Sequence, residues 1–203
     1  MRIINLSQQS GDWLFWRNGG IGGSDVGVIV GAVPKNWGTR EGLLRSKRAH
    51  RGKLRTTDKN KSPAMMRGIE LEPKVRQDYN SLMGRQAVPI CCVHDELDFI
   101  RASLDGWDET VRDGLVVEIK CPNDGDHGTA LGGTVPSKYW PQVQHQLLVT
   151  GAKRLHYVSF SDRPRWRPEE QLKVVPVSPS VEYMDFLRVE ETKFWQELTE
   201  SLK

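Results

Sequence analysis

The stretch Ser103–Pro122, which reads SLDGWDETVRDGLVVEIKCP, places two ionised residues inside an apolar run. Val117 and Ile119 flank Glu118 and Lys120, and this alternation predicts a strand. Successive side chains on a strand point to opposite faces, so Glu118 and Lys120 share one face. Ionised groups are costly to bury unless something compensates their charge. The strand is therefore expected to carry a charged site on one face of a sheet.

Periodicity divides the rest of the chain into further helices and strands. The 203 residues are enough for one domain with a sizeable core. Apolar spacing predicts helices over residues 64–84, 136–150 and about 180–202. Alternating or apolar runs predict strands over residues 88–93, 97–104, 114–120, 153–160 and 172–177. We expect a single domain that spans residues 1–203.

Two further carboxylates are expected to reach the charged strand. The preceding strand ends at Asp105, and hairpin pairing would bring Asp105 beside Glu118. On the helix predicted over residues 64–84, Glu72 lies on the apolar stripe. A carboxylate is costly to bury there, which makes Glu72 a candidate for a functional role. The following Pro73 leaves a second interpretation open, because a proline in a new first turn would make Glu72 a helix cap.

Carboxylates and a lysine in this arrangement suit metal-assisted phosphate chemistry. Mg²⁺ and Mn²⁺ prefer carboxylate, water and phosphate oxygens. Two such ions can activate a water and stabilise the leaving oxygen, and Lys120 can orient that water. An E-x-K triplet alone is common by chance, so Asp105 on the preceding strand adds most of the specificity. Gln142 begins a predicted helix and could position a water or a phosphate; a surface amide is the alternative.

Two other regions are candidates for binding a polyanion. Arg17 precedes a glycine-rich bend and Ser24, where helix N–H groups could bind a phosphate. A capped tight turn with a surface arginine is the simpler local interpretation. Residues 45–61 hold eight Lys or Arg against one Asp. This composition predicts a mobile basic loop that binds phosphate backbones. The alternative is a solvated loop that has no partner. The residues assigned to DNA contact there are Arg45, Lys47, Arg48, Arg51, Lys53 and Arg55.

Net charge, apolar runs and cysteine content indicate where the protein is located but say little about its activity. The formal charge is only +3, so net charge alone does not indicate a nucleic-acid partner. No apolar run approaches the length of a membrane span, and the N-terminus lacks the apolar core of a signal peptide. Three cysteines without a CxxC pattern indicate reduced thiols in a cytosolic setting, with no membrane partner.

Four motifs follow one another along the chain: RGxxxE (Arg67, Gly68, Glu72), SLDG (Ser103–Gly106), EIKCP (Glu118–Pro122) and QVQ (Gln142–Gln144). In this order they resemble the lambda exonuclease or YqaJ-type viral recombinase family, which comprises alkaline exonucleases of the PD-(D/E)xK superfamily from phages and prophages. The resemblance extends over about residues 12–160. It implies an α/β fold with a central mixed β-sheet flanked by helices and a restriction-endonuclease-like nuclease core.

For the reaction, the resemblance implies a Mg²⁺-dependent 5′-to-3′ exonuclease that acts on double-stranded DNA ends and leaves a 3′ single strand. Two Mg²⁺ ions are implied, for which Mn²⁺ can substitute. Asp105, Glu118 and the Ile119 carbonyl would be metal ligands, and Glu72 would help to hold the second metal or its water. Lys120 would activate the nucleophilic water, and Gln142 would support it.

For substrate and partners, the resemblance assigns Arg17 and Ser24 to a pocket for the 5′-phosphate. It also implies a homotrimer, a single-strand annealing protein as recombination partner, and the cytoplasm of a bacterial host as location. Two departures stand out: Leu104 replaces the proline of the superfamily name, and Asp25 would repel a phosphate unless it caps the helix or binds a group further out.

Two alternative functions stay open at the level of sequence. One is another nuclease of the same superfamily, such as an endonuclease that cuts branched or specific DNA. The other is a DNA-binding or annealing module with an inactive nuclease fold. Degradation of covalently closed circles would favour the endonuclease, and hydrolysis that disappears on replacing Asp105, Glu118 or Lys120 would exclude the inactive module.

Overall fold

A mixed sheet of six strands forms the centre of the protein. The structure, a computed structural model, describes residues 1–53 and 61–200, and every strand named here lies in those ranges. The strands lie side by side in sequence order, and β4 and β5 are the parallel pair. They are β1 (Arg2–Ile4), β2 (Val88–Val93), β3 (Arg101–Asp108), β4 (Leu115–Lys120), β5 (Leu155–Phe160) and β6 (Leu172–Val177). The expected α/β fold with a mixed central sheet is confirmed.

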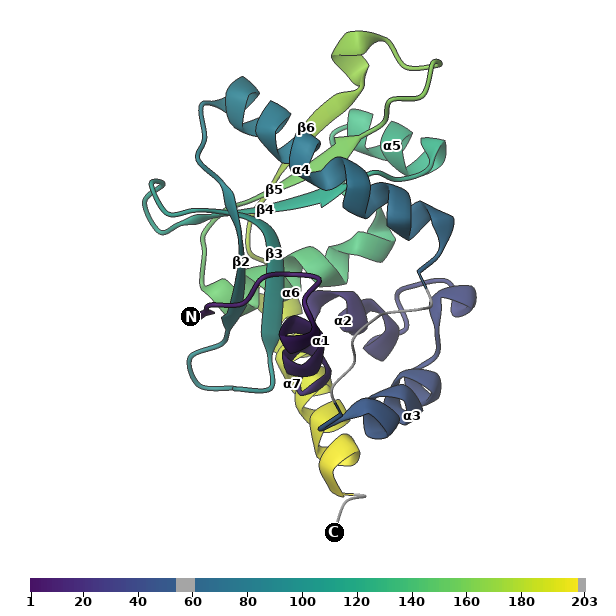
Figure 1. Cartoon of the computed structure of the whole chain (residues 1–203), viewed down its shortest axis with the longest axis vertical. Helices are drawn as coiled ribbons and strands as arrows, with labels where there is room; N and C mark the ends of the chain where they lie inside the picture. The colour runs from purple at the N-terminus through teal and green to yellow at the C-terminus, as the bar shows by residue number, and fades with distance from the viewer. Residues whose placement is uncertain (54–60, 201–203) are drawn as a thin grey trace.

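Two helices cover opposite faces of this sheet (Figure 1). The helix α4 (Pro63–Met83) packs over Val117 and Ile119 of β4. The helix α6 (Trp140–Thr150) covers the other face, which includes Val116, and forms part of the crossover that the parallel strands β4 and β5 require. The alternation predicted for β4 is confirmed, and its two ionised side chains face α6.

The remaining helices pack beside the sheet and around α6. An apolar cluster joins α2, α3, α6 and α7, while α1 packs Trp13 and Leu14 against Cys91 of β2. Across residues 1–53 and 61–200, no helix combines the length and apolar character needed to cross a membrane. These helices are α1 (Gly11–Asn18), α2 (Gly23–Ile29), α3 (Arg40–His50), α5 (Asp124–Leu131) and α7 (Val181–Glu200).

The second predicted strand is displaced along the chain. The sequence predicts it over residues 97–104, whereas β3 spans Arg101–Asp108. Residues before Ile100 form a turn instead, closed by a 2.9 Å hydrogen bond from the Ile100 amide to the Leu97 carbonyl. Asp105 therefore lies within a strand rather than at its end. The predictions for residues 88–93 and 172–177 match β2 and β6.

The prediction of a mobile loop over residues 45–61 is wrong for residues 45–50, which belong to α3. Thr39 caps this helix by accepting a 3.1 Å hydrogen bond from the Gly42 amide, and Leu44 is buried. The prediction failed because the many cations in this segment outnumber the few apolar residues, including Leu44, that pack the helix against the protein. Residues 54–60, which include Arg55, lie outside the described residues.

The helix α4 continues through Pro73. It begins after Ser62, whose hydroxyl accepts a hydrogen bond from the Met65 amide, and ends at Gly84 with φ of +60°. Glu72 is therefore a residue of the helix interior, which removes the interpretation of Glu72 as a cap. Its side chain is half-buried and points off α4 toward β3.

Candidate active site

A β-bulge positions Asp105. Where β2 has the single residue Pro89, β3 has two residues, Asp105 and Gly106. Two residues opposite one define a bulge, a feature that redirects side chains and is common beside active sites. Pro89 also has no N–H to donate to the ladder at this point. Within the bulge, Asp105 Oδ2 accepts a 2.8 Å hydrogen bond from the Ile119 amide on β4.

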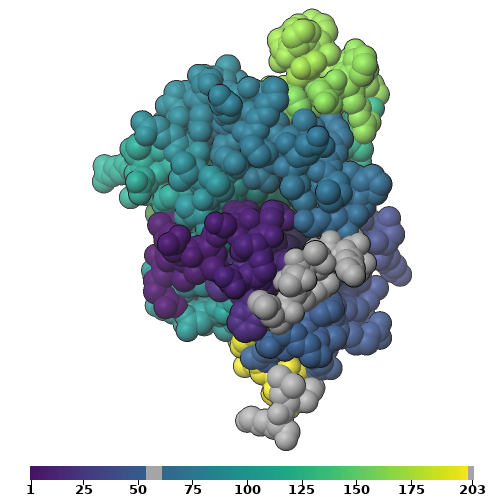
Figure 2. Space-filling view, viewed as in Figure 1, coloured from purple at the N-terminus to yellow at the C-terminus, as the bar shows by residue number. Residues whose placement is uncertain are grey.

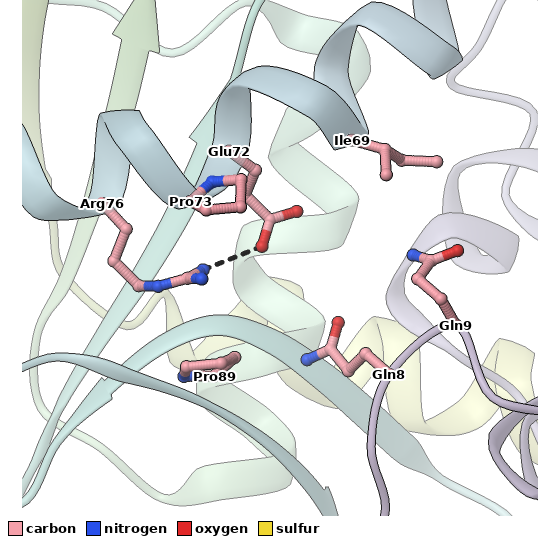
Figure 3. Close-up of a pocket in the computed structure, with 7 residues that line it drawn as sticks. All are labelled: Gln8, Gln9, Ile69, Glu72, Pro73, Arg76 and Pro89. Carbon is pink, nitrogen blue, oxygen red and sulfur yellow. Dashed lines mark hydrogen bonds and ion pairs between the residues drawn. The ribbon is translucent and has the colours of Figure 1, made fainter.

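Side chains from two other segments bind backbone carbonyl groups at the bulge and immediately before it. Arg76 Nη1 donates to the Asp105 carbonyl oxygen at 2.7 Å and to Glu72 Oε1 at 2.8 Å. Gln8, in the segment before α1, donates to the Leu104 carbonyl at 2.9 Å. Arg76 thus fixes Glu72 next to the bulge, as the dashed line in Figure 3 shows.

Glu118 is enclosed by hydrogen-bond donors. Its Oε1 accepts a 2.6 Å hydrogen bond from Gln142 and pairs with the Lys120 ammonium. Its Oε2 accepts a 2.5 Å hydrogen bond from Gln146, and the side chain is 1% exposed. The two glutamines are four positions apart, so both lie on the same face of α6. The helix therefore holds both oxygens of one buried carboxylate.

Negative charge is concentrated where these elements meet. Burial raises the pKa of Asp105 well above its usual range, and the charges of Glu118 and Glu72 raise it further, while Lys120 opposes them. For Lys120, burial lowers the pKa, but the neighbouring Glu118 and Asp105 outweigh burial and raise it. Three carboxylates share this region with Lys120 and Arg76. The cluster retains uncompensated negative charge.

This charge balance fits a divalent cation. Among the residues that the structure describes, no three His, Cys, Asp or Glu side chains converge into a complete metal site. Mg²⁺ does not require one, because it is usually bound by one or two carboxylates with waters and substrate phosphates. Asp105 and Glu118 carry hard carboxylate oxygens on the adjacent strands β3 and β4, and Asp105 is bonded to the Ile119 amide that follows Glu118. A cation there would relieve the repulsion that raises the pKa of Asp105.

The glycine-rich bend brings Arg17 and Ser24 together. Arg17 Nη2 donates to Ser24 Oγ at 2.5 Å, and its guanidinium carbon lies 5.1 Å from the centre of the Trp13 ring. Gly23, at the start of α2, is pressed against Gln142: a Cβ there would lie 3.1 Å from Gln142 Cγ. The pair of Arg17 and Ser24 therefore adjoins the helix that holds the carboxylate cluster.

The negative charge of Asp25 is matched within the protein. Its Oδ2 accepts a 2.9 Å hydrogen bond from the Gly22 amide at the start of α2 and lies 2.8 Å from Lys47 Nζ. Lys47 also donates to the Gly20 carbonyl at 2.7 Å and is 5% exposed. The prediction that Lys47 contacts DNA is therefore wrong: the residue is buried and fixes the bend.

The other basic residues of the predicted loop divide into two groups. Arg48 donates to the Glu197 carbonyl at 2.8 Å, and the Arg51 guanidinium lies 4.7 Å from the Trp195 ring centre, so both tie α3 to α7. Arg45 and Lys53 are exposed, and their role in DNA contact stays a prediction.

Two residues of the site escaped the sequence reasoning. Gln146 follows Gln142 by one helical turn, so both lie on one face of the predicted helix, and this spacing was the available signal. Arg76 follows Glu72 by the same interval, which identifies it as a partner for that carboxylate. Arg76 binds the residue one turn before it, Glu72, whereas Gln146 joins Gln142 in binding Glu118.

Comparison with known proteins agrees with this geometry. The family model described as the YqaJ-like viral recombinase domain matches residues 12–153. The crystal structure of an alkaline exonuclease, LHK-Exo, from Laribacter hongkongensis is similar with a TM-score of 0.76 and 25% identity, over 94% of this chain and 93% of that chain. LHK-Exo in complex with dAMP gives a TM-score of 0.73 and 24% identity, over 92% of each chain.

A phage-related exonuclease from Haemophilus somnus 129PT shares the fold, with a TM-score of 0.63 and 15% identity over 91% of this chain and 96% of that chain. No curated protein sequence matches the chain. The similarity to exonucleases indicates nuclease activity. Because the family model covers more than half of the 203 residues, the chain belongs to the family of the YqaJ-like viral recombinase domain.

Proposed function

We propose that the protein is a Mg²⁺-dependent 5′-to-3′ exonuclease that degrades one strand of linear double-stranded DNA and leaves 3′ single-stranded tails for recombination. The observation that carries the proposal is the cluster of Asp105, Glu118 and Lys120 on β3 and β4, in a chain that belongs to a viral recombinase family. Its carboxylates crowd together without enough cations to balance them.

Each residue of the cluster has a part in phosphodiester hydrolysis. Asp105, Glu118 and the Ile119 carbonyl would hold Mg²⁺, with Glu72 close to a second ion or its water. When bound, such ions lower the pKa of a water and stabilise the leaving oxygen. Lys120 can donate a hydrogen bond to the attacking water and balance charge that develops on the phosphate. Gln142 supports this arrangement because it holds Glu118.

Arg17 and Ser24 are proposed to bind the 5′-phosphate of the DNA end. A guanidinium with a hydroxyl beside it can donate several charge-assisted hydrogen bonds to a phosphate. The complex of LHK-Exo with dAMP, a 5′-deoxynucleotide, supports a DNA substrate for this chain as well. The proposal includes a homotrimer and a single-strand annealing protein as partner, which rest on the family resemblance.

The proposal is tested by digestion of linear duplex DNA labelled at either the 5′ or the 3′ end. With Mg²⁺, we expect the 5′ label to be released first as a small product, and we expect no release with chelator. Covalently closed circles should remain intact under the same conditions. Degradation of closed circles would contradict exonuclease action, and release of the 3′ label first would contradict the polarity.

A further inference from the structure

A cavity of about 210 Å³ lies beside Glu72. It is formed where the segment before α1 meets α4 and β2, and Figure 2 shows the N-terminal segment and α4 side by side on the surface. The cavity lining includes Gln8 and Gln9 from the N-terminal segment, Ile69 and Glu72 from α4, and Pro89 of β2, which lies opposite the bulge of β3. It therefore opens next to the carboxylate cluster.

The size of the cavity suits one ring system. A cavity of about 150 Å³ in a protein core can hold one benzene molecule. A volume of about 210 Å³ accordingly admits a single heterocyclic base, whereas a base pair is too large for it. Ile69 and Pro73 of α4 lie across the opening from Pro89, as Figure 3 shows, and give a planar ring apolar surfaces to pack against.

The polar groups at one end of the cavity form a donor and an acceptor. The Gln8 amide nitrogen donates to the Leu104 and Ile90 carbonyls at 2.9 and 3.3 Å, so its oxygen is the atom turned toward the cavity. Gln9 is oriented in the opposite sense, because its oxygen accepts a 2.7 Å hydrogen bond from Lys61 and its nitrogen faces inward. Paired donors and acceptors are what the edge of a nucleobase presents.

The backbone at Gln9 is held in an uncommon conformation. Its φ is +70°, in the left-handed region that residues other than glycine seldom occupy. Such conformations persist where the surrounding structure enforces them, and they cluster at ligand sites. Here the turn aims the Gln9 amide at the cavity.

The charges around the cavity disfavour a phosphate as its occupant. Arg76 is the cation of the lining, and its Nη1 is already bonded to Glu72 at 2.8 Å and to the Asp105 carbonyl at 2.7 Å. The Glu72 carboxylate would repel an anion that entered beside it. A neutral ring with a hydrogen-bonding edge needs no free cation and is not repelled by the Glu72 carboxylate.

We propose that this cavity binds the base of a nucleotide next to the scissile phosphate, an inference that rests on the proposed nuclease function. The base packs between Ile69 and Pro73 on one side and Pro89 on the other. Its edge meets the oxygen of Gln8 and the nitrogen of Gln9. Insertion of the base separates that nucleotide from its neighbours in the stack and carries its phosphate toward the carboxylate cluster.

The test measures DNA binding without hydrolysis. Duplexes with a 5′-phosphate carry a single abasic nucleotide at the first, second or third position of the 5′ strand, and binding is followed by fluorescence anisotropy in chelator. For the wild type, we expect the abasic change at one of these positions to weaken binding about fivefold. Ile69→Trp fills the cavity and should remove this positional difference, whereas Gln77→Trp, on the exposed side of the same helix, should retain it.

Gln9→Ala provides a second test that leaves α4 untouched, and it should reduce the same difference by removing the donor. Equal binding of all abasic duplexes by the wild type would overturn the inference, as would an equal positional difference in Ile69→Trp and Gln77→Trp. These results are independent of catalysis. A positional difference that depends on the cavity, together with no Mg²⁺-dependent digestion, would contradict the proposed function and leave the base site standing.

Discussion

Two buried polar clusters share the helix α6, and they differ in charge balance. On the side of the sheet, Gln142 and Gln146 hold Glu118 in a region crowded with carboxylates. On the side of α7, His145 Nδ1 lies 2.9 Å from Glu191 Oε1, and both side chains are 0% exposed. His145 Nε2 makes a second hydrogen bond of 2.8 Å with the Arg101 carbonyl.

The cluster at α7 is matched in charge, although Glu191 Oε2 is buried without a hydrogen-bond partner, whereas the cluster at the sheet has excess negative charge. Burial lowers the pKa of His145, but Glu191 and the Arg101 carbonyl outweigh burial and raise it, which favours the protonated ring beside the Glu191 carboxylate. At the sheet, burial and two neighbouring carboxylates raise the pKa of Asp105. A matched pair stabilises the fold, whereas excess charge of one sign favours a ligand of the other sign. The two clusters should therefore respond in opposite ways to the loss of a carboxylate.

The largest expected effect follows from Asp105→Asn. Without this carboxylate, hydrolysis of linear DNA should fall on the order of 10³-fold or more, because a metal ligand is lost. The same change should leave the metal-free protein as stable as the wild type or more stable, because repulsion with Glu118 and Glu72 is relieved. Rates of nucleotide release and urea unfolding in chelator check the two parts. A variant that loses activity because it unfolds would remove the contrast between the clusters.

The next effect concerns Glu191→Ala in the matched cluster. Removing one partner leaves His145 buried without its counter-charge, and unfolding free energy should fall by about 3 kcal/mol. Activity per folded molecule should stay near that of the wild type, since Glu191 belongs to the cluster at α7 and not to the carboxylate cluster. Urea unfolding and active-site titration measure these quantities. A loss of activity in fully folded protein would show that the α7 cluster also serves catalysis.

The matched cluster also predicts a dependence of stability on pH. The pKa of His145 is raised by Glu191 and, further away, by Asp25, so folding favours the protonated ring. Its contribution is fully present below the unfolded pKa of about 6.5 and is lost as the pH rises through the higher folded pKa. The difference in unfolding free energy between wild type and His145→Gln should therefore shrink as the pH rises above about 6.5. A difference that grows with pH would assign His145 the opposite protonation state.

The smallest expected effect is that of Arg76→Ala, which tests whether Arg76 contributes to the function of the carboxylate cluster. The change releases Glu72 and the Asp105 carbonyl, so kcat should fall about tenfold with little change in KM. Lys74→Ala is the matched control, because Lys74 forms an exposed ion pair with Asp78 on the same helix. Steady-state kinetics on linear duplex DNA separates the two variants. Equal rates for both would show that Arg76 only supports α4.

Local periodicity was sufficient to predict the central strand of the site. The alternation around Glu118 and Lys120 depends on neighbours two residues away, and it placed both side chains on one face as β4 has them. The motif order along the chain also identified the family. Both signals reside in short stretches of sequence, which is why they survive without knowledge of the tertiary fold.

Features that depend on pairing between distant segments could not be predicted in this way. The bulge at Asp105 arises where β3 pairs with β2 at Pro89, and no local sequence pattern around Asp105 predicts it. The burial of Lys47 depends on Asp25, far away in sequence on another helix. A run of cations predicts a loop when each charge is assumed to face solvent, and this assumption failed for α3.

The most direct measurement is calorimetric titration of Mg²⁺ into metal-free wild type, Asp105→Asn and Glu191→Gln, each at a temperature where the protein is folded. The account predicts that Mg²⁺ binds to the wild type and to Glu191→Gln with similar affinity, and that Asp105→Asn weakens binding at least about tenfold. Equal binding by the wild type and Asp105→Asn would contradict the assignment of the carboxylate cluster on β3 and β4 as the metal site.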